Sequence, residues 1–167
     1  TIPSEAKKKV HTIGDSTMAN YATDGTTDKR GWAQMLQQFF NVDNVTVNNR
    51  GKSGASSKSF YLESAYWPTL VTGGSDAMQA GDFLLIQFAH NDEKNGGADG
   101  DVVKEYYANQ GDATTAASTD YRGTTASGTY KEYIRKYIDE AKAMGVKPIV
   151  VGPICRKYFS TDGQSIK

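Results

Sequence analysis

The chain has 167 residues, enough for one domain with a hydrophobic core. Its 19 Lys and Arg residues balance its 19 Asp and Glu residues, and this neutrality argues against a nucleic-acid-binding surface, which usually carries a basic excess. No apolar run approaches the roughly 20 residues that span a bilayer, and a single cysteine, Cys155, excludes a disulfide within the chain.

Strands and helices alternate along the first half of the sequence. Residues 10–13 predict a short strand, and residues 31–40 carry apolar side chains at the spacing of an amphipathic helix. The β-branched run within residues 42–48 predicts a second strand, and residues 56–64 predict a second helix. The nearly continuous apolar run of residues 82–89 predicts a third strand that is buried on both faces of a sheet.

Residues 95–128 have a different composition, rich in Gly, Asp, Ala, Thr and Ser and without a sustained period. We expect them to form a long surface insertion. Residues 129–144 then form the clearest helical pattern of the chain. Thr129 and Glu132 have the spacing of a capping box, and Gly145 occupies the position that often follows a helix.

A fourth strand is predicted at residues 149–151, ended by Gly152 and Pro153. Strands that alternate with helices form right-handed crossovers and a parallel sheet that helices cover on both faces. Such sheets bind ligands at the carboxyl ends of their strands. The loops that follow the predicted strands are therefore where functional residues are expected.

The first such loop is Gly14-Asp15-Ser16-Thr17. A serine on a sharp turn between a strand and a helix is exposed, and the turn directs backbone N–H groups toward an anion. The alternative is a structural turn in which Ser16 only caps a helix.

Two further loops follow the second and third strands. Residues 48–57 form a Gly/Ser-rich loop whose bare backbone lets a substrate approach closely, although it has no phosphate-binding P-loop pattern. His90, Asn91 and Asp92 follow the third strand, and an asparagine amide there can donate to a developing oxyanion. Taken singly, these segments are better explained as an ordinary βα loop and a polar strand cap.

In chain order the three loops resemble the conserved blocks of the SGNH (GDSL) hydrolase superfamily. The likeness is closer to the rhamnogalacturonan acetylesterase group, in the nucleophile block, in residues 54–60, and in residues 81–83 with 90–92. The resemblance spans residues 10–153 and implies a flavodoxin-like three-layer α/β/α fold with a parallel sheet. It makes residues 1–167 a single domain that lacks the C-terminal part of that fold.

The resemblance also implies site residues and a reaction. Ser16 is the nucleophile, and the Ser16 N–H, the Gly54 N–H and the Asn91 side chain form the oxyanion hole, with Gly51 as a rival to Gly54. No metal or organic cofactor is required. The implied substrate is an O-acetylated, pectin-like polysaccharide met outside the cytoplasm, with no membrane partner. A lipase or thioesterase, or a non-catalytic carbohydrate-binding fragment, remains an alternative.

A base for Ser16 is not evident. The superfamily uses an Asp-x-x-His near its C-terminus, and no such motif occurs here. His11 lies within the first strand and is expected to be packed. His90 and Asn91 are neighbours, so on a strand they would point to opposite faces. We therefore expect the chain to be a fragment of a longer enzyme, with the edge of the fourth strand exposed.

Several other side chains have a plain interpretation beside a functional one. Cys155 is expected to be a small buried side chain. The tyrosines of the insertion are expected either to pack or to stack on sugars, namely Tyr106, Tyr107 and Tyr121. We expect solvated charges rather than polysaccharide or calcium ligands at Arg50, Lys52, Lys58, Asp92, Glu93, Asp99 and Asp101.

Overall fold

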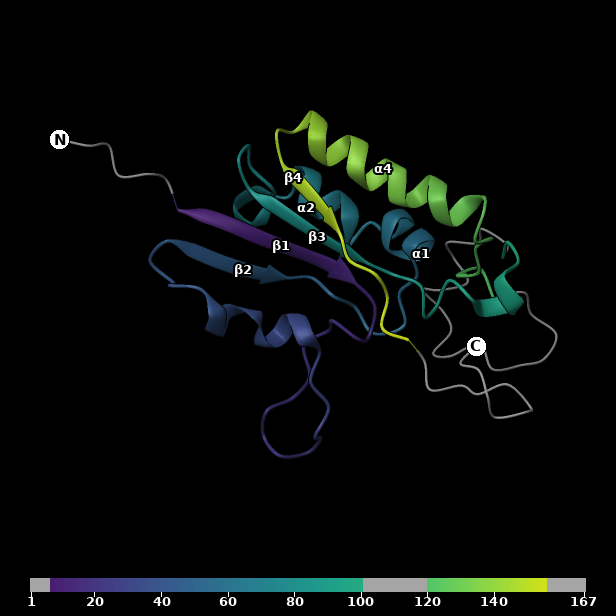
Figure 1. Ribbon diagram of the computed structural model, residues 1–167, viewed down its shortest axis with the longest axis horizontal. Helices are drawn as coiled ribbons and strands as arrows, with labels where there is room; N and C mark the ends of the chain where they lie inside the picture. The colour runs from purple at the N-terminus through teal and green to yellow at the C-terminus, as the bar shows by residue number, and fades with distance from the viewer. Residues whose placement is uncertain (1–6, 101–119, 156–167) are drawn as a thin grey trace.

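A computed structural model describes residues 7–100 and 120–155 of the chain. Its centre is a parallel sheet with the strand order β2-β1-β3-β4 (Figure 1). The strands are β1 (Lys8–Gly14), β2 (Val45–Asn49), β3 (Phe83–Gln87) and β4 (Lys147–Val150). All four predicted strands are confirmed, and so is the parallel α/β fold class.

Three α-helices pack together on one face of the sheet: α1 (Ser57–Leu62), α2 (Trp67–Thr72) and α4 (Thr129–Ala143) (Figure 1). Short 3₁₀ helices complete the described elements: η1 (Trp32–Phe39), η2 (Gly74–Asp76) and η3 (Lys94–Gly97). The helix α2 was not predicted from the sequence; it has six residues, with proline in its first turn, where a missing N–H costs nothing.

The two faces of the sheet are covered to different extents. On the α-helical face, Leu84 and Ile86 of β3 are 0% exposed and belong to a core that includes Phe60, Phe88 and Tyr137. Phe88 stacks on Tyr137 with ring centroids 5.7 Å apart. We call this side of the sheet the covered face.

The other face, which we call the open face, is only partly covered by η1. Phe83 and Leu85 line a cavity of about 350 Å³ there, together with Leu36, Phe40 and Ile149. Both β3 residues are half-buried, so the predicted burial of this strand on both faces is wrong for the described structure. A run of apolar residues indicates a strand, but it does not show how much chain packs on each side.

The segment at residues 31–40 is helical as predicted, but it forms the 3₁₀ helix η1. Gln37 ties it to the edge strand, because its side chain accepts from the Val47 N–H at 2.7 Å and donates to the Val45 carbonyl at 3.2 Å. Apolar spacing identifies a helical segment without distinguishing i→i+3 from i→i+4 bonding. Phe39, on this helix, is 74% exposed.

The sequence predicts the C-terminal end of α4 correctly but not its N-terminal end. Gly145 adopts a φ of +75° directly after the helix, as predicted for a terminating glycine. The capping box is wrong, because Gly128 is the N-cap and Thr129 is the first helical residue. The Thr129 hydroxyl instead accepts from the N–H of Thr125, four residues before it, at 2.9 Å.

Candidate active site

Ser16 lies at the turn that follows β1. The buried carboxylate of Asp15 shapes this turn by accepting from the Thr17 N–H at 2.9 Å and from the Thr17 hydroxyl at 2.8 Å. Gly14 allows the chain to pass closely over the end of β3, because a Cβ at this position would collide with the Gln87 carbonyl. Ser16 itself stays half-buried at the apex, with its carbonyl accepting from Tyr21 at 2.7 Å.

The second loop is tied directly to this turn. The Lys52 N–H donates to the Gly14 carbonyl at 2.9 Å, and the Ala55 N–H donates back to the Lys52 carbonyl at 3.1 Å. Gly54, at the third position of this four-residue turn, has a φ of +83°, as a type II turn requires. The loop ends where Ser56 caps α1 through a reciprocal pair of bonds with Ser59.

The third loop closes on the second. The buried Asn91 side chain donates one amide N–H to the Ala55 carbonyl at 2.9 Å. The Asp92 carboxylate accepts from the Ser57 N–H at 3.0 Å and from the Thr124 hydroxyl at 2.9 Å. The His90 N–H reaches the Asp15 carboxylate at 3.4 Å. All three predicted blocks therefore meet at one edge of the sheet.

Asp92 corrects an expectation about the acidic residues of this region. It is 5% exposed rather than solvated, and its burial raises the pKa of its carboxyl above the ordinary value, although the hydrogen bonds from Ser57 and Thr124 oppose the shift. Glu93 and Asp99 are exposed, and Asp101 lies outside the described residues. Over residues 7–100 and 120–155, no three His, Cys, Asp or Glu side chains gather as a metal site would need.

Two backbone donors stand out at the meeting point of the loops. Within the described part of the chain, neither the Ser16 N–H nor the Gly54 N–H has a hydrogen-bond acceptor. The Gly51 N–H, by contrast, donates to the Asn49 side chain at 3.0 Å. Unpaired N–H groups near a serine hydroxyl can stabilise an oxyanion, and of the two glycines it is Gly54 whose N–H is left without an acceptor among the described residues.

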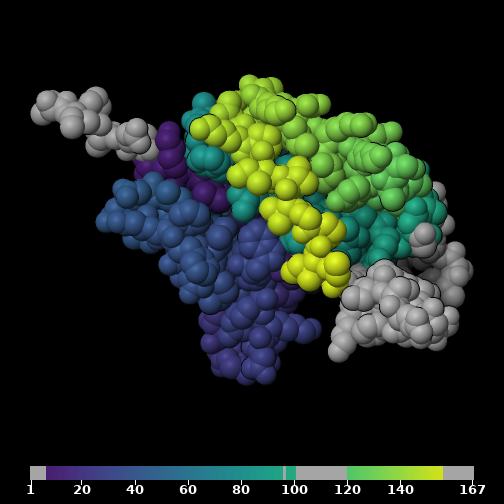
Figure 2. Space-filling model, in the orientation of Figure 1, coloured from purple at the N-terminus to yellow at the C-terminus, as the bar shows by residue number. Residues whose placement is uncertain are grey.

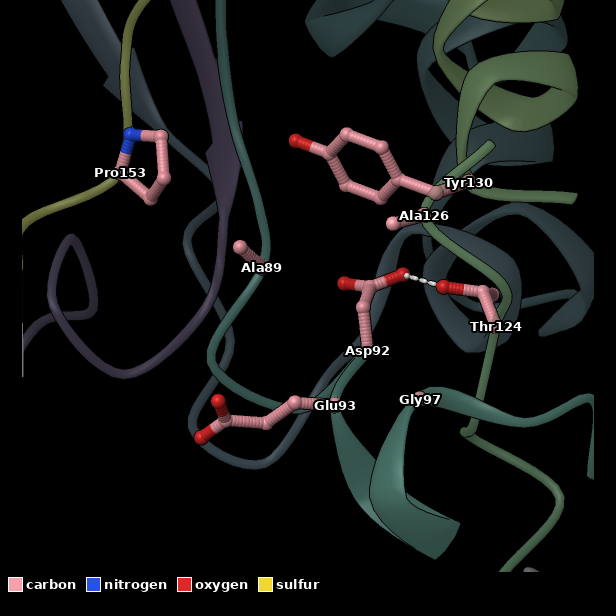
Figure 3. A pocket seen from close by; sticks show the side chains of 8 residues that line it. All are labelled: Ala89, Asp92, Glu93, Gly97, Thr124, Ala126, Tyr130 and Pro153. Atoms are coloured by element: carbon pink, nitrogen blue, oxygen red, sulfur yellow. Dashed lines mark hydrogen bonds between the residues drawn. The ribbon is translucent and has the colours of Figure 1, made fainter. Parts of the chain in front are cut away.

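A cavity of about 310 Å³ lies between the third loop and the start of α4 (Figure 3). Tyr130 points into it from α4, opposite Pro153 and beside Asp92. The Tyr130 hydroxyl donates to the Phe88 carbonyl at 3.0 Å. Burial, with the nearby carboxylates of Asp92 and Asp15, raises the pKa of Tyr130 to about 12, so its hydroxyl stays protonated near neutral pH.

Among the described residues, the hydrogen bonds of both histidine rings go to groups other than Ser16. His11 is fully buried, as expected, and its ring lies 3.2 Å from Asp82 on one side and 3.2 Å from Asn48 on the other. The His90 ring reaches the Ile154 carbonyl at 2.5 Å. The strand argument for His90 and Asn91 is wrong, because β3 ends at Gln87, yet the two side chains still contact different segments.

Other predicted side chains are placed as follows. Lys58 is buried rather than solvated, and its ammonium donates to the Gly100 carbonyl at 2.8 Å. Lys52 is exposed, whereas Arg50 donates to Thr69 at 3.0 Å. Cys155 is exposed and not buried. The Tyr121 side chain packs in the interior, and Tyr106 and Tyr107 lie outside the described residues.

A segment that was not predicted from the sequence joins the second and third loops. Arg122 donates to the Gly54 carbonyl at 3.2 Å, and the Thr124 N–H donates to the Asp92 carbonyl at 2.9 Å. Both residues lie in the 95–128 stretch, whose polar composition carries no periodic signal. A residue that acts through one side-chain bond to a backbone carbonyl leaves no such signal in a single sequence.

Comparison with known proteins places the chain in a family. Residues 12–165 match the model of the GDSL-like lipase/acylhydrolase family, to which the chain therefore belongs. It is 28% identical over 156 residues to the rhamnogalacturonan acetylesterase RhgT of Bacillus subtilis, covering 93% of this chain and 53% of RhgT. It is also 28% identical to a rhamnogalacturonan acetylesterase of Emericella nidulans, covering 80% of this chain and 47% of that protein.

A solved structure supports the fold. The crystal structure of the YxiM protein of Bacillus subtilis superposes with a TM-score of 0.63 at 21% identity, covering 94% of this chain and 36% of YxiM. The chain spans about half the length of the relatives that it matches. Among the described helices, none combines the length and the apolar character that crossing a membrane demands.

Proposed function

We propose that the protein to which this chain belongs is a serine esterase that removes O-acetyl groups from a pectin-like polysaccharide. The observation that carries the proposal is the pair of unpaired N–H groups of Ser16 and Gly54, beside the Asn91 amide, on loops that hydrogen bonds hold together. Family membership supports hydrolysis of an acyl ester, and the rhamnogalacturonan acetylesterases among its relatives support this substrate class.

In the proposed reaction, the Ser16 hydroxyl attacks the carbonyl carbon of an acetyl ester. The N–H groups of Ser16 and Gly54 donate to the oxyanion of the tetrahedral intermediate, together with the second amide N–H of Asn91. One such donor typically lowers the barrier by about 3–4 kcal/mol. The bond between the carbonyl carbon and the sugar oxygen then breaks, the sugar oxygen takes the proton that a base removed from Ser16, and water hydrolyses the acetyl-serine that remains.

A serine hydroxyl needs a base to take its proton. The chain has two histidines, and both rings are engaged elsewhere, with Asp82 and Asn48 or with the Ile154 carbonyl. We propose that the base is a histidine outside residues 1–167. We also propose that the protein is secreted or periplasmic, because its polymer substrate lies outside the cytoplasm.

The test replaces Ser16 in the protein at its full encoded length. Ser16→Ala should lower acetate release from acetylated pectin by at least about a thousandfold, because removal of a serine nucleophile leaves only residual catalysis. The matched control is Ser64→Ala, at an exposed serine beyond α1, which should match the unaltered protein. Undiminished acetate release by Ser16→Ala would refute the assignment.

The acyl group is tested separately from the nucleophile. We expect the kcat/KM for p-nitrophenyl acetate to exceed that for long-chain p-nitrophenyl esters. A preference for long acyl chains that disappears in Ser16→Ala would retain Ser16 as the nucleophile and replace the acetylesterase by a lipase or thioesterase of the same fold.

A further inference from the structure

Three segments meet at Gly54, and one of them has no role in the reaction described so far. The turn at residues 52–55 is tied to the nucleophile turn through Lys52 and to the third loop through Ala55. A third contact comes from Arg122, whose guanidinium donates to the Gly54 carbonyl at 3.2 Å. This carbonyl belongs to the peptide that directly follows the proposed oxyanion donor.

The Arg122 side chain is held firmly by its neighbour Asp120. The guanidinium donates to the Asp120 carboxylate from Nε at 2.9 Å and from Nη2 at 2.6 Å, and the Arg122 backbone N–H donates to it at 3.0 Å. Both side chains are 13% exposed. A bidentate pair of this kind fixes the plane of the guanidinium and therefore the direction of its remaining donors.

The backbone that carries this pair is anchored as well. Asn95 brackets Asp120, accepting from its N–H at 2.9 Å and donating to its carbonyl at 2.7 Å. Two residues after Arg122, Thr124 bonds to Asp92 through both its N–H and its hydroxyl, at 2.9 Å each. We call residues 120–124 the clamp.

The clamp therefore joins two loops that each supply a proposed oxyanion donor. It holds the Gly54 turn through Arg122, and it holds the loop of Asn91 through Thr124 and Asp92. An oxyanion hole works only when its donors lie at hydrogen-bond distance from one oxygen, and a displacement of about 1 Å can cost a hundredfold in rate. Glycine at position 54 leaves the turn flexible unless something outside it restrains the backbone.

We propose that Arg122 is a positioning residue for the oxyanion hole, oriented by Asp120, and that it holds the Gly54 N–H in register with the Asn91 amide. This inference rests on the proposed esterase function. Arg122 acts through the Gly54 peptide and has no contact with the acetyl group. Its loss should therefore affect the transition state more than the binding of substrate.

The first test is kinetic and uses the full-length protein with p-nitrophenyl acetate. Arg122→Ala should lower kcat by roughly 10- to 100-fold while KM changes by less than about threefold, because a misplaced donor weakens a contact made in the transition state. Arg122→Lys should be intermediate, since lysine reaches the carbonyl without the bidentate bond to Asp120. Free guanidinium in millimolar amounts should partly restore the kcat of Arg122→Ala.

The matched control is Arg135→Ala, which removes an exposed arginine from α4 and should leave kcat unchanged. If Arg122→Ala keeps full kcat while Ser16→Ala is inactive, the positioning role is wrong and the proposed function stands. If the unaltered protein releases no acetate, the proposed function fails, and the catalytic role of Arg122 fails with it.

The second test does not depend on activity. Hydrogen exchange of two backbone amides reports how firmly the turn is held. The Lys52 amide is hydrogen-bonded to the Gly14 carbonyl, and the Ala55 amide to the Lys52 carbonyl within the turn. Arg122→Ala should speed their exchange and Arg135→Ala should not. Equal exchange in the two variants would overturn the inference that Arg122 restrains the Gly54 turn.

Discussion

The covered and open faces of the sheet contrast although they share the same strands. On the covered face, α1, α2 and α4 exclude water from Leu84 and Ile86, which are 0% exposed. On the open face, η1 is the one described helix that lies against the sheet, and Ile149 remains 46% exposed. Figure 2 shows β4, in yellow, on the surface of the molecule. The helices on one side, and not the strands themselves, decide where the core is.

This difference matters for the edge of the sheet that carries the candidate site, because the covered face supports two of the loops there. Tyr137 of α4 donates to the Ser57 carbonyl at 2.6 Å, and Tyr130 donates to the Phe88 carbonyl at 3.0 Å. On the side of the open face, the backbone N–H of Trp32, in η1, donates to the Thr17 carbonyl at 2.9 Å. The geometry of the second and third loops should therefore depend on the packing of α4.

The largest expected effect compares neighbouring residues of β3 that point to opposite faces. Ile86→Ala should lower the free energy of unfolding by about 2–5 kcal/mol, because it leaves a cavity in a closed core. Leu85→Ala should cost at most about half of that, since Leu85 already lines an open cavity. Urea unfolding of both variants measures the difference. Equal losses would mean that the two faces are equally buried in solution.

A smaller effect is expected from one hydroxyl in the helical layer. Tyr137→Phe removes the bond to the Ser57 carbonyl and should lower the free energy of unfolding by about 1 kcal/mol. Tyr133→Phe is the control, because its hydroxyl has no hydrogen bond within the described residues. Denaturant unfolding distinguishes the two variants. Matching stabilities would show that the Ser57 bond contributes nothing.

The sequence predicts the elements well where their signal is local. Apolar runs identify β1 to β4, and the spacing of apolar residues identifies α4, because both patterns follow from strand and helix geometry. Gly145 is recognised as the residue after α4 for the same reason. The partial exposure of β3 on the open face was not predicted, because the burial of Phe83 and Leu85 depends on which part of the chain packs against them.

The candidate site likewise has some residues with a local sequence signal and others without one. Ser16, Gly54 and Asn91 are proposed from three short motifs, and the structure brings their loops to one edge of the sheet. Their catalytic roles stay predictions. Arg122 was not predicted, because it meets Gly54 only through a contact 68 residues away in the sequence. Such long-range contacts become visible only when the chain is folded.

A pH-dependent effect is expected from His11, a buried polar group among the apolar residues of the sheet. Burial lowers the pKa of His11 below its ordinary value of 6.5, although the adjacent Asp82 opposes the shift. The unfolded chain therefore takes up a proton before the folded chain does. The stability that depends on a neutral His11 should be fully present above about pH 6.5. It should be lost as the pH falls through the lowered pKa.

The measurement is the free energy of unfolding as a function of pH for the unaltered protein and for His11→Gln. The variant should lose less stability than the unaltered protein between about pH 6.5 and pH 5, because glutamine does not titrate. The groups that face His11 are Asp82, Asn48, Lys9 and Asp76. Parallel pH curves for the two proteins would show that His11 is not the group responsible.

The smallest effect is expected on the open face. Phe39, on η1, is 74% exposed, so Phe39→Ser should change the free energy of unfolding by no more than about 0.5 kcal/mol. Phe40 is the control, since it is 37% exposed and lines the cavity, and Phe40→Ser should cost more. A loss well above 1 kcal/mol for Phe39→Ser would mean that this side chain is buried in solution. The open face would then be covered by a surface that the described residues do not supply.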